Sequence, residues 1–134
     1  MTFDEAVALL CAVDAQSIMT PEERRFLWDT ATELRGEVIE AGTAYGGTAA
    51  LLALAGADRV HAIDSGESKV WDQFHANMVS MGVGDRVVAI NAPCLNVVDT
   101  FADGAYSIVI VDANHHGDDP RRDLIAYAPK TKVG

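Results

Sequence analysis

The chain has 134 residues, of which 49% are hydrophobic, and a formal net charge of −10. This length allows one domain with a substantial core, and the apolar fraction is too high for a disordered chain. The negative charge argues against a nucleic acid as partner, because a phosphate backbone needs a basic face. No apolar stretch approaches the length of a membrane span, so no membrane partner is expected.

Cysteine use and the first residues indicate a cytoplasmic protein. The two cysteines, Cys11 and Cys94, have neither the spacing of a metal site nor that of a disulfide framework, so we expect reduced thiols. Residues 1–15 contain three acids and no basic residue, unlike a signal peptide.

Two helices are predicted before the first strand. The first begins at a capping box of Thr2 and Glu5, and its pattern breaks at Gln16–Met19. The second begins at Thr20–Glu23, which supplies a cap residue, a proline in the first turn and a glutamate three residues after the cap; it ends near Gly36. One face of this helix is expected to carry its apolar side chains, Phe26, Leu27, Ala31 and Leu34.

The stretch Val38–Thr48, VIEAGTAYGGT, predicts a buried strand, a glycine turn and a buried helix. We place the strand at Glu37–Ala41 and the helix at Gly46–Ala55. Glycine lets a ligand approach the turn closely, and the free N–H groups at the start of a helix can face a polar or anionic group. The alternative is a turn with a purely structural role.

Glu40 narrows the class of ligand that this turn would bind. A dinucleotide-binding turn places its backbone against a pyrophosphate. A carboxylate two residues before the first glycine, Gly42, would repel that group. The same carboxylate suits a cofactor that carries an amine or a sulfonium cation.

The order acid, x, Gly, x, x, x, Gly over Glu40–Gly46 resembles motif I of class I S-adenosylmethionine (SAM) methyltransferases. Ala44 replaces the usual middle glycine. With Tyr45–Thr48 following, the motif is most similar to small-molecule O-methyltransferases of the catechol and macrolide-sugar type. The resemblance implies that SAM is bound by the acid and the turn: Glu40, Gly42, Thr43, Ala44, Tyr45 and Gly46.

A second strand, Val60–Ile63, ends in Asp64, which lies 22 positions after Gly42. An acid at about that distance can accept hydrogen bonds from both ribose hydroxyls, and Ser65 stands beside it. The alternative is that Asp64 or Ser65 caps the next helix. The pairing with the glycine turn favours ribose binding, although it does not separate SAM from NAD.

The middle of the chain predicts a helix at Ser68–Met81 and a third, buried strand at Val87–Ile90, followed by a short helical piece around Leu95–Phe101. Asn91 and Ala92 follow the strand at a place where the resembling family contacts adenine. The helix carries an apolar stripe that is expected to pack in the core: Val70, Trp71, Phe74, Met78 and Met81.

A fourth strand is predicted at Tyr106–Val111. Its end is continuously apolar, as expected for a strand that is covered on both faces. A last helix spans about Pro120–Tyr127. Strands alternate with helices, which predicts an α/β fold with right-handed crossovers. Together with the resemblance, this gives a Rossmann-like parallel sheet in the order 3-2-1-4, preceded by N-terminal helices.

The segment Asp112–Asp119 concentrates acids and histidines at the carboxyl end of a strand, where ligands bind in open α/β sheets. The resemblance implies that Asp112 orients the cofactor or binds Mg²⁺, an ion that prefers oxygen ligands. Asn114 stands where a second acid is common, and His115 would be the general base. A solvated loop, or a zinc site that includes His116, is the alternative.

The chain departs from the family in its length. A complete class I methyltransferase has seven strands in the order 3-2-1-4-5-7-6, and we count four. We therefore expect a single SAM-binding domain, residues 1–134, that is a fragment of a longer protein. Its fourth strand would have an exposed apolar edge, which favours association with a second copy of the chain.

The sequence thus predicts a SAM-dependent methyltransferase that acts on an oxygen of a small hydroxylated molecule. Two other functions stay open. An NAD-type dehydrogenase fragment would use Gly42, Ala44 and Gly47 as its fingerprint and leaves Glu40 unexplained. A non-catalytic module would bind SAM or only a partner protein.

Overall fold

The computed structural model describes residues 1–13, 15, 19–112 and 119–132. Its four strands are all parallel and form one sheet in the order β3-β2-β1-β4, which confirms the predicted Rossmann-like order. The strands are β1 (Glu37–Ala41), β2 (Arg59–Asp64), β3 (Val87–Asn91) and β4 (Ile108–Val111).

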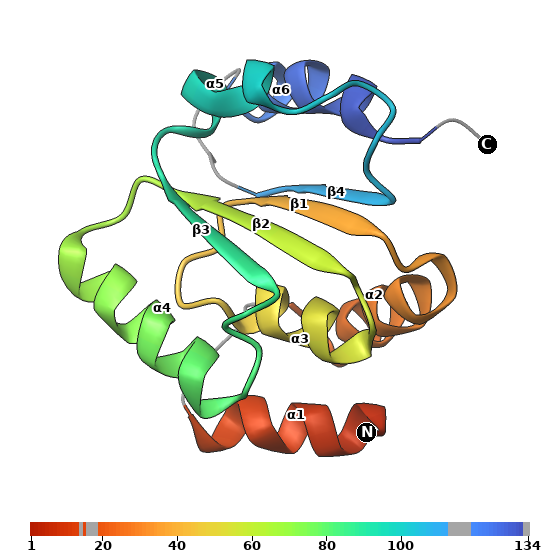
Figure 1. Cartoon of the computed structure of the whole chain (residues 1–134), viewed down its shortest axis with the longest axis vertical. Helices are drawn as coiled ribbons and strands as arrows, with labels where there is room; N and C mark the ends of the chain where they lie inside the picture. The colour runs from red at the N-terminus through yellow and green to blue at the C-terminus, as the bar shows by residue number, and fades with distance from the viewer. Residues whose placement is uncertain (14, 16–18, 113–118, 133–134) are drawn as a thin grey trace.

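Helices cover the two faces of the sheet unequally (Figure 1). Helices α1 to α4 lie on one side, and the shorter α5 and α6 lie on the other. Short 3₁₀ turns follow α5 at Val98–Thr100 and α6 at Ala128–Lys130. The helices are α1 (Phe3–Ala12), α2 (Pro21–Leu34), α3 (Gly47–Ala55), α4 (Ser68–Ser80), α5 (Cys94–Val97) and α6 (Asp119–Tyr127).

Both N-terminal helices begin at the predicted capping boxes. In α2 the Thr20 hydroxyl accepts from the Glu23 N–H at 3.2 Å, and the Glu23 carboxylate accepts from the Thr20 N–H at 2.8 Å. Thr2 and Glu5 make the same pair of bonds in α1. Each cap contributes about 1 kcal/mol of helix stability.

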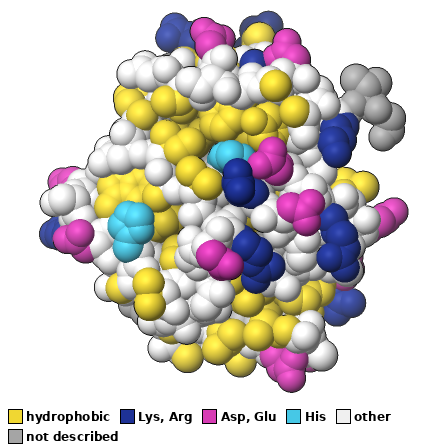
Figure 2. Space-filling model, in the orientation of Figure 1, with side chains coloured by type: hydrophobic (Ala, Val, Ile, Leu, Met, Phe, Trp, Pro, Cys, Tyr) yellow, Lys and Arg dark blue, Asp and Glu magenta, His cyan; other side chains and the backbone are white. Residues whose placement is uncertain are grey.

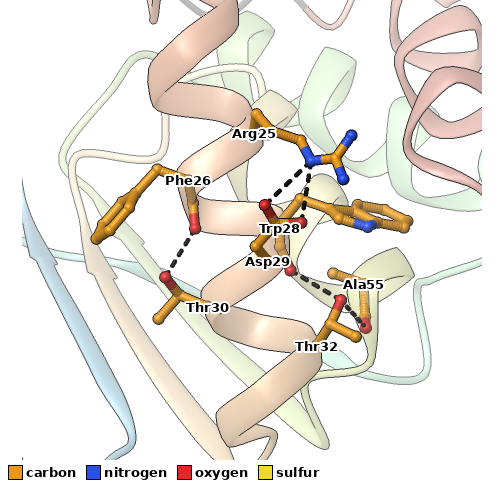
Figure 3. A network of polar contacts seen from close by, with 7 residues as sticks. All are labelled: Arg25, Phe26, Trp28, Asp29, Thr30, Thr32 and Ala55. Carbon is orange, nitrogen blue, oxygen red and sulfur yellow. Dashed lines mark hydrogen bonds and ion pairs between the residues drawn. The ribbon is translucent and has the colours of Figure 1, made fainter.

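The predicted apolar face of α2 is wrong in part. Phe26 is 69% exposed and Leu34, the last residue of the helix, is 52% exposed, whereas Trp28 and Ala31 are buried. Phe26 precedes Trp28 by two residues, about 200° around a helix, and Figure 3 shows the two side chains pointing to opposite sides of α2.

Polar contacts along α2 fix it within the layer of helices (Figure 3). Thr32 Oγ1 donates to the Trp28 carbonyl at 2.8 Å, and it also lies 3.3 Å from the Ala55 carbonyl at the end of α3. On the outer side, Arg25 Nε donates to the carboxylate of Asp29 at 3.0 Å. The contact with Ala55 therefore joins α2 to the helix that follows the glycine turn.

Helix α3 is buried because it lies between the sheet and helices α1 and α2. Eight of its nine residues are buried, and most are alanine or leucine. Successive strand residues face opposite sides of a sheet, so β1 directs Val38 toward α3 and Ile39 toward the layer of α5 and α6. Glu40 shares the face of Val38.

The third strand is not buried as predicted. Strand β3 is an edge of the sheet, and Val88 and Asn91 on it are exposed. Figure 2 shows hydrophobic side chains at the surface over this part of the sheet. An apolar run gives the same sequence pattern in a central strand and at an edge, and here it has a neighbouring strand on one side only.

The fourth strand is shorter than predicted because Tyr106 pairs elsewhere. The Tyr106 N–H donates to the Lys130 carbonyl at 3.0 Å, and the Lys132 N–H donates to the Tyr106 carbonyl at 2.9 Å. Tyr106 and Thr131 thereby form an isolated parallel bridge. Within the described ranges, no strand pairs with the outer edge of Ile108–Val111.

Candidate functional site

The carboxyl ends of β1, β2 and β4 meet at one rim of the sheet. The register pairs Glu40 with Ala62 of β2 and with Ile110 of β4. The Asp112 N–H donates to the Ala41 carbonyl at 2.8 Å, which places this predicted site residue one position beyond β4 at the same rim. Three of the predicted acids, Glu40, Asp64 and Asp112, therefore lie at or next to the carboxyl ends of adjacent strands.

The turn after β1 is anchored to the end of β2. The N–H groups of Gly42 and Thr43 both donate to the Ile63 carbonyl, at 2.8 and 3.1 Å. Ala44 has a φ of +46°, and its N–H donates to Asp64 Oδ2 at 2.8 Å. One carboxylate oxygen of Asp64 thus holds the turn, and α4 begins after an N-cap at Glu67, so neither Asp64 nor Ser65 caps that helix.

Gly46 is fixed by packing against α4. Its φ is +85°, a conformation that disfavours residues with a Cβ. A Cβ on Gly46 would lie 2.5 Å from Cε of Met78 and 2.8 Å from Cδ2 of Phe74. Whatever ligand the turn binds, this predicted site glycine therefore has a structural requirement of its own.

We expect Gly46→Ala to lower the free energy of unfolding by about 1–3 kcal/mol more than Gly82→Ala does, the usual range for overpacking. Gly82 is a matched control, because its φ is also positive, at +70°, and no atom lies within 4 Å of the Cβ position. Urea unfolding of both variants measures the difference. Equal losses would mean that the turn moves away from α4 without cost.

Glu40 is a buried acid with no compensating base among the residues that the structure describes. The residue is 3% exposed, and neither Glu40 Oε2 nor Thr43 Oγ1 has a hydrogen-bond partner within the described ranges. Burial raises the pKa of Glu40 to about 8; the charges of Asp112 and Asp64 add to the increase, and the Thr43 side chain opposes it. The arrangement favours a ligand that brings a positive charge and a hydrogen-bond donor to this carboxyl group.

Because the folded-state pKa of Glu40 lies above its ordinary value of 4.5, the folded chain binds this proton more tightly than the unfolded chain does. The corresponding stability is complete below pH 4.5 and is lost as the pH rises toward 8. We expect the unliganded protein to lose more stability between pH 6 and pH 8 than Glu40→Gln, as measured by urea unfolding. Identical pH dependence in both proteins would contradict the assignment to Glu40.

A cavity of about 250 Å³ opens beside Asp64. It brings together Gly42, Asp64, Ser65 and Ala92 of the predicted site, but not Asn91, which is exposed. Sequence analysis missed the part of its wall formed by residues 93–96. The signal was available, because these residues follow a strand at the rim where ligands of open α/β sheets bind.

The acidic and histidine-rich segment is placed only at its start. Asn114, His115 and His116 lie outside the described residues, so neither the predicted base nor the histidines of the alternative zinc site are located. Within the described ranges, no group of three His, Cys, Asp or Glu side chains could hold a metal ion. Asp112 alone does not make a magnesium site.

Most of the chain, including the strands and the turn at this rim, matches a known protein family. Residues 39–134 match the family model described as a methyltransferase domain. The chain belongs to this family. No curated protein matches the chain.

Solved structures share the fold of this methyltransferase domain. Cofactor-bound Rv0187 from MTB is 24% identical with a TM-score of 0.75, and 98% of the chain covers 61% of that protein. The O-methyltransferase from Bacillus cereus, in complex with SAH, is 17% identical with a TM-score of 0.74, and the match covers 98% of this chain and 62% of that protein. The O-methyltransferase TomG from Streptomyces achromogenes, involved in tomaymycin synthesis and solved with SAM, is 19% identical with a TM-score of 0.75. That match covers 98% of this chain and 61% of TomG.

The methyltransferase domain therefore spans about three fifths of the length of these structures. The resemblance to SAM-dependent methyltransferases is confirmed, and the family match decides against the dehydrogenase alternative. In the described part of the chain, no helix is both long enough and apolar enough to span a bilayer.

Proposed function

We propose that the domain binds SAM and transfers its methyl group to an oxygen of a small hydroxylated molecule. The observation that carries this proposal is the buried Glu40 carboxyl group, whose Oε2 has no partner among the described residues. A buried polar atom without a partner costs free energy and is rare unless a ligand uses it. The structures solved with SAM and with SAH lend support, since they share this fold.

Each element at the rim has a separate part in holding the cofactor. Glu40 and Thr43 would bind its cationic amino group through Oε2 and Oγ1, which have no hydrogen-bond partner among the described residues. Asp64 would bind the ribose, because only its Oδ2 is engaged by the turn. The cavity beside Asp64 would receive the adenine, against residues 92–96.

The bound cofactor supplies an electrophilic methyl group on a sulfonium. The chain would contribute in-line positioning, with Asp112 orienting the donor and His115 taking the proton of the acceptor hydroxyl. The described residues alone do not form a magnesium site, so no step is derived through a metal. We place this reaction in the cytoplasm, in keeping with two cysteines that form no disulfide.

Replacing Glu40 by Gln tests the proposal directly. The variant keeps the size of the side chain but cannot ionise to pair with a cation, so we expect its affinity for SAM to fall by more than its affinity for uncharged adenosine. Isothermal titration of both ligands into both proteins measures the two losses. Equal losses would remove the electrostatic argument for SAM, and undetectable binding of SAM to the unmodified protein would overturn the proposal.

We also propose a second copy of the chain as a partner at the outer edge of β4. The free part of this edge, Ile108–Val111, carries no charged residue or proline that would oppose strand pairing. Next to it lies a groove of about 660 Å³. Its walls combine apolar residues, among them Phe26, Leu27 and Ile110, with the acids Glu22, Glu23 and Asp112. Pairing at the edge would cover this groove.

We expect the chain to self-associate at micromolar concentration and Phe26→Gln to weaken the association. Val79→Gln is the matched control, because Val79 is an exposed apolar residue of α4, 78% exposed, remote from β4. Sedimentation velocity over a concentration series measures both effects. A monodisperse monomer, or equal effects of the two substitutions, would contradict this partner.

A further inference from the structure

Helix α4 carries one polar side chain in its buried stripe, and the predicted core does not account for it. Asn77 is 1% exposed and lies on the side of α4 that buries Trp71, Phe74 and Met78. A buried amide is costly unless its donors and acceptor are satisfied. The position therefore has a specific use for a side-chain amide.

The contacts of Asn77 show that use. Its Nδ2 donates to the backbone carbonyl of Tyr45 at 3.0 Å, across 32 positions of sequence. Its Oδ1 accepts from Nε2 of Gln73, one turn earlier on α4, at 2.8 Å. Gln73 thereby orients the amide so that the NH₂ group faces the turn.

The Tyr45 carbonyl belongs to the centre of the turn after β1. Because a peptide unit is planar, holding this carbonyl also fixes the direction of the Gly46 N–H. That N–H donates back across the turn to the Thr43 carbonyl at 2.9 Å. The side chain of Tyr45 is exposed, so this residue is held through its backbone rather than through its ring.

The turn is thus held from two sides. On the sheet side, Asp64 and the Ile63 carbonyl hold the N–H groups of residues 42–44. On the helix side, Asn77 holds the Tyr45 carbonyl, and Gly46 packs beneath Phe74 and Met78. Rotation of the peptide between residues 45 and 46 would break both the bond from Asn77 and the bond to Thr43.

We propose that Asn77 is a positioning residue for the cofactor, which acts through the Tyr45 carbonyl to keep the turn over residues 43–46 in its binding conformation. This role rests on the proposed function, because it assigns the turn to SAM. Asn77 itself has no part in the chemistry. It contributes by limiting the turn to fewer backbone conformations, so that less conformational freedom of the turn is lost when the ligand binds.

Asn77→Leu tests the proposal in the whole chain. Leucine has a similar size, favours a helix and suits the apolar surroundings, so the variant is expected to fold. It leaves the Tyr45 carbonyl without its donor, and we expect its affinity for SAH to fall about tenfold, as for the loss of one buried hydrogen bond. Gln73→Leu removes only the orienting contact, and we expect a smaller loss.

Met81→Ala is the control for general destabilisation of α4. Met81 is buried at the end of the helix, and the described hydrogen bonds of the turn do not involve it. We expect this variant to unfold more easily and to bind SAH within about twofold of the unmodified protein, since it leaves the turn intact. An equal loss of affinity in Asn77→Leu and Met81→Ala would reduce Asn77 to a core residue.

Hydrogen exchange without ligand separates this inference from the function on which it rests. We expect the amides of residues 43–48 to exchange faster in Asn77→Leu than in the unmodified chain or in Met81→Ala. Unchanged exchange in Asn77→Leu would overturn the positioning role even if SAH binds. Faster exchange, with no SAH binding to the unmodified protein, would support the role in holding the turn and overturn its assignment to SAM.

Discussion

The burial of an acid at the end of the central strand is the constraint on which the rest of the site depends. Strand β1 has neighbouring strands on both sides, and Glu40 on it is only 3% exposed. A carboxyl group there is costly because no described base accompanies it, and the nearby acids Asp64 and Asp112 add to the cost. Such a position favours a cationic ligand, and that preference separates this turn from a dinucleotide-binding one.

The rigidity of the turn comes from elements that are distant in sequence. Strand β2 supplies the Ile63 carbonyl and the Asp64 carboxylate, and α4 supplies the Asn77 amide and the surface on which Gly46 rests. None of these contacts needs a ligand. The turn is therefore formed in advance, and binding would not have to order it, which lowers the entropic cost of association. Asp64 holds the turn through Oδ2, and the ribose contact proposed for it would use the other carboxylate oxygen.

The parts of this fold that were predictable from the sequence are those that local chemistry determines. The capping boxes of α1 and α2, the strand at Glu37–Ala41 and the turn around Gly42 each have a signature within a few residues. The failures involve neighbours that a local pattern does not reveal. The apolar run of β3 does not show that Val88 is exposed at the edge of the sheet, where the predicted order places this strand. Likewise, the apolar residues of α2 do not show that Trp28, rather than Phe26, faces the core. The use of Asn77 depends on a carbonyl in another part of the chain.

The two roles proposed for this domain, cofactor binding and methyl transfer, are assigned to different parts of the sheet. Glu40, Asp64 and the turn held by α4, to which we assign the amino and ribose groups of the cofactor, lie on or beside β1 and β2, which have partners on both sides, and next to the buried α3. Asp112 follows β4, whose outer edge along Ile108–Val111 pairs with no strand in the described part of the chain and which is only half-buried over most of its length. Local opening is cheapest where few contacts hold the backbone. Cofactor binding should therefore be the more robust property of this chain, and methyl transfer should depend on what covers the edge of β4.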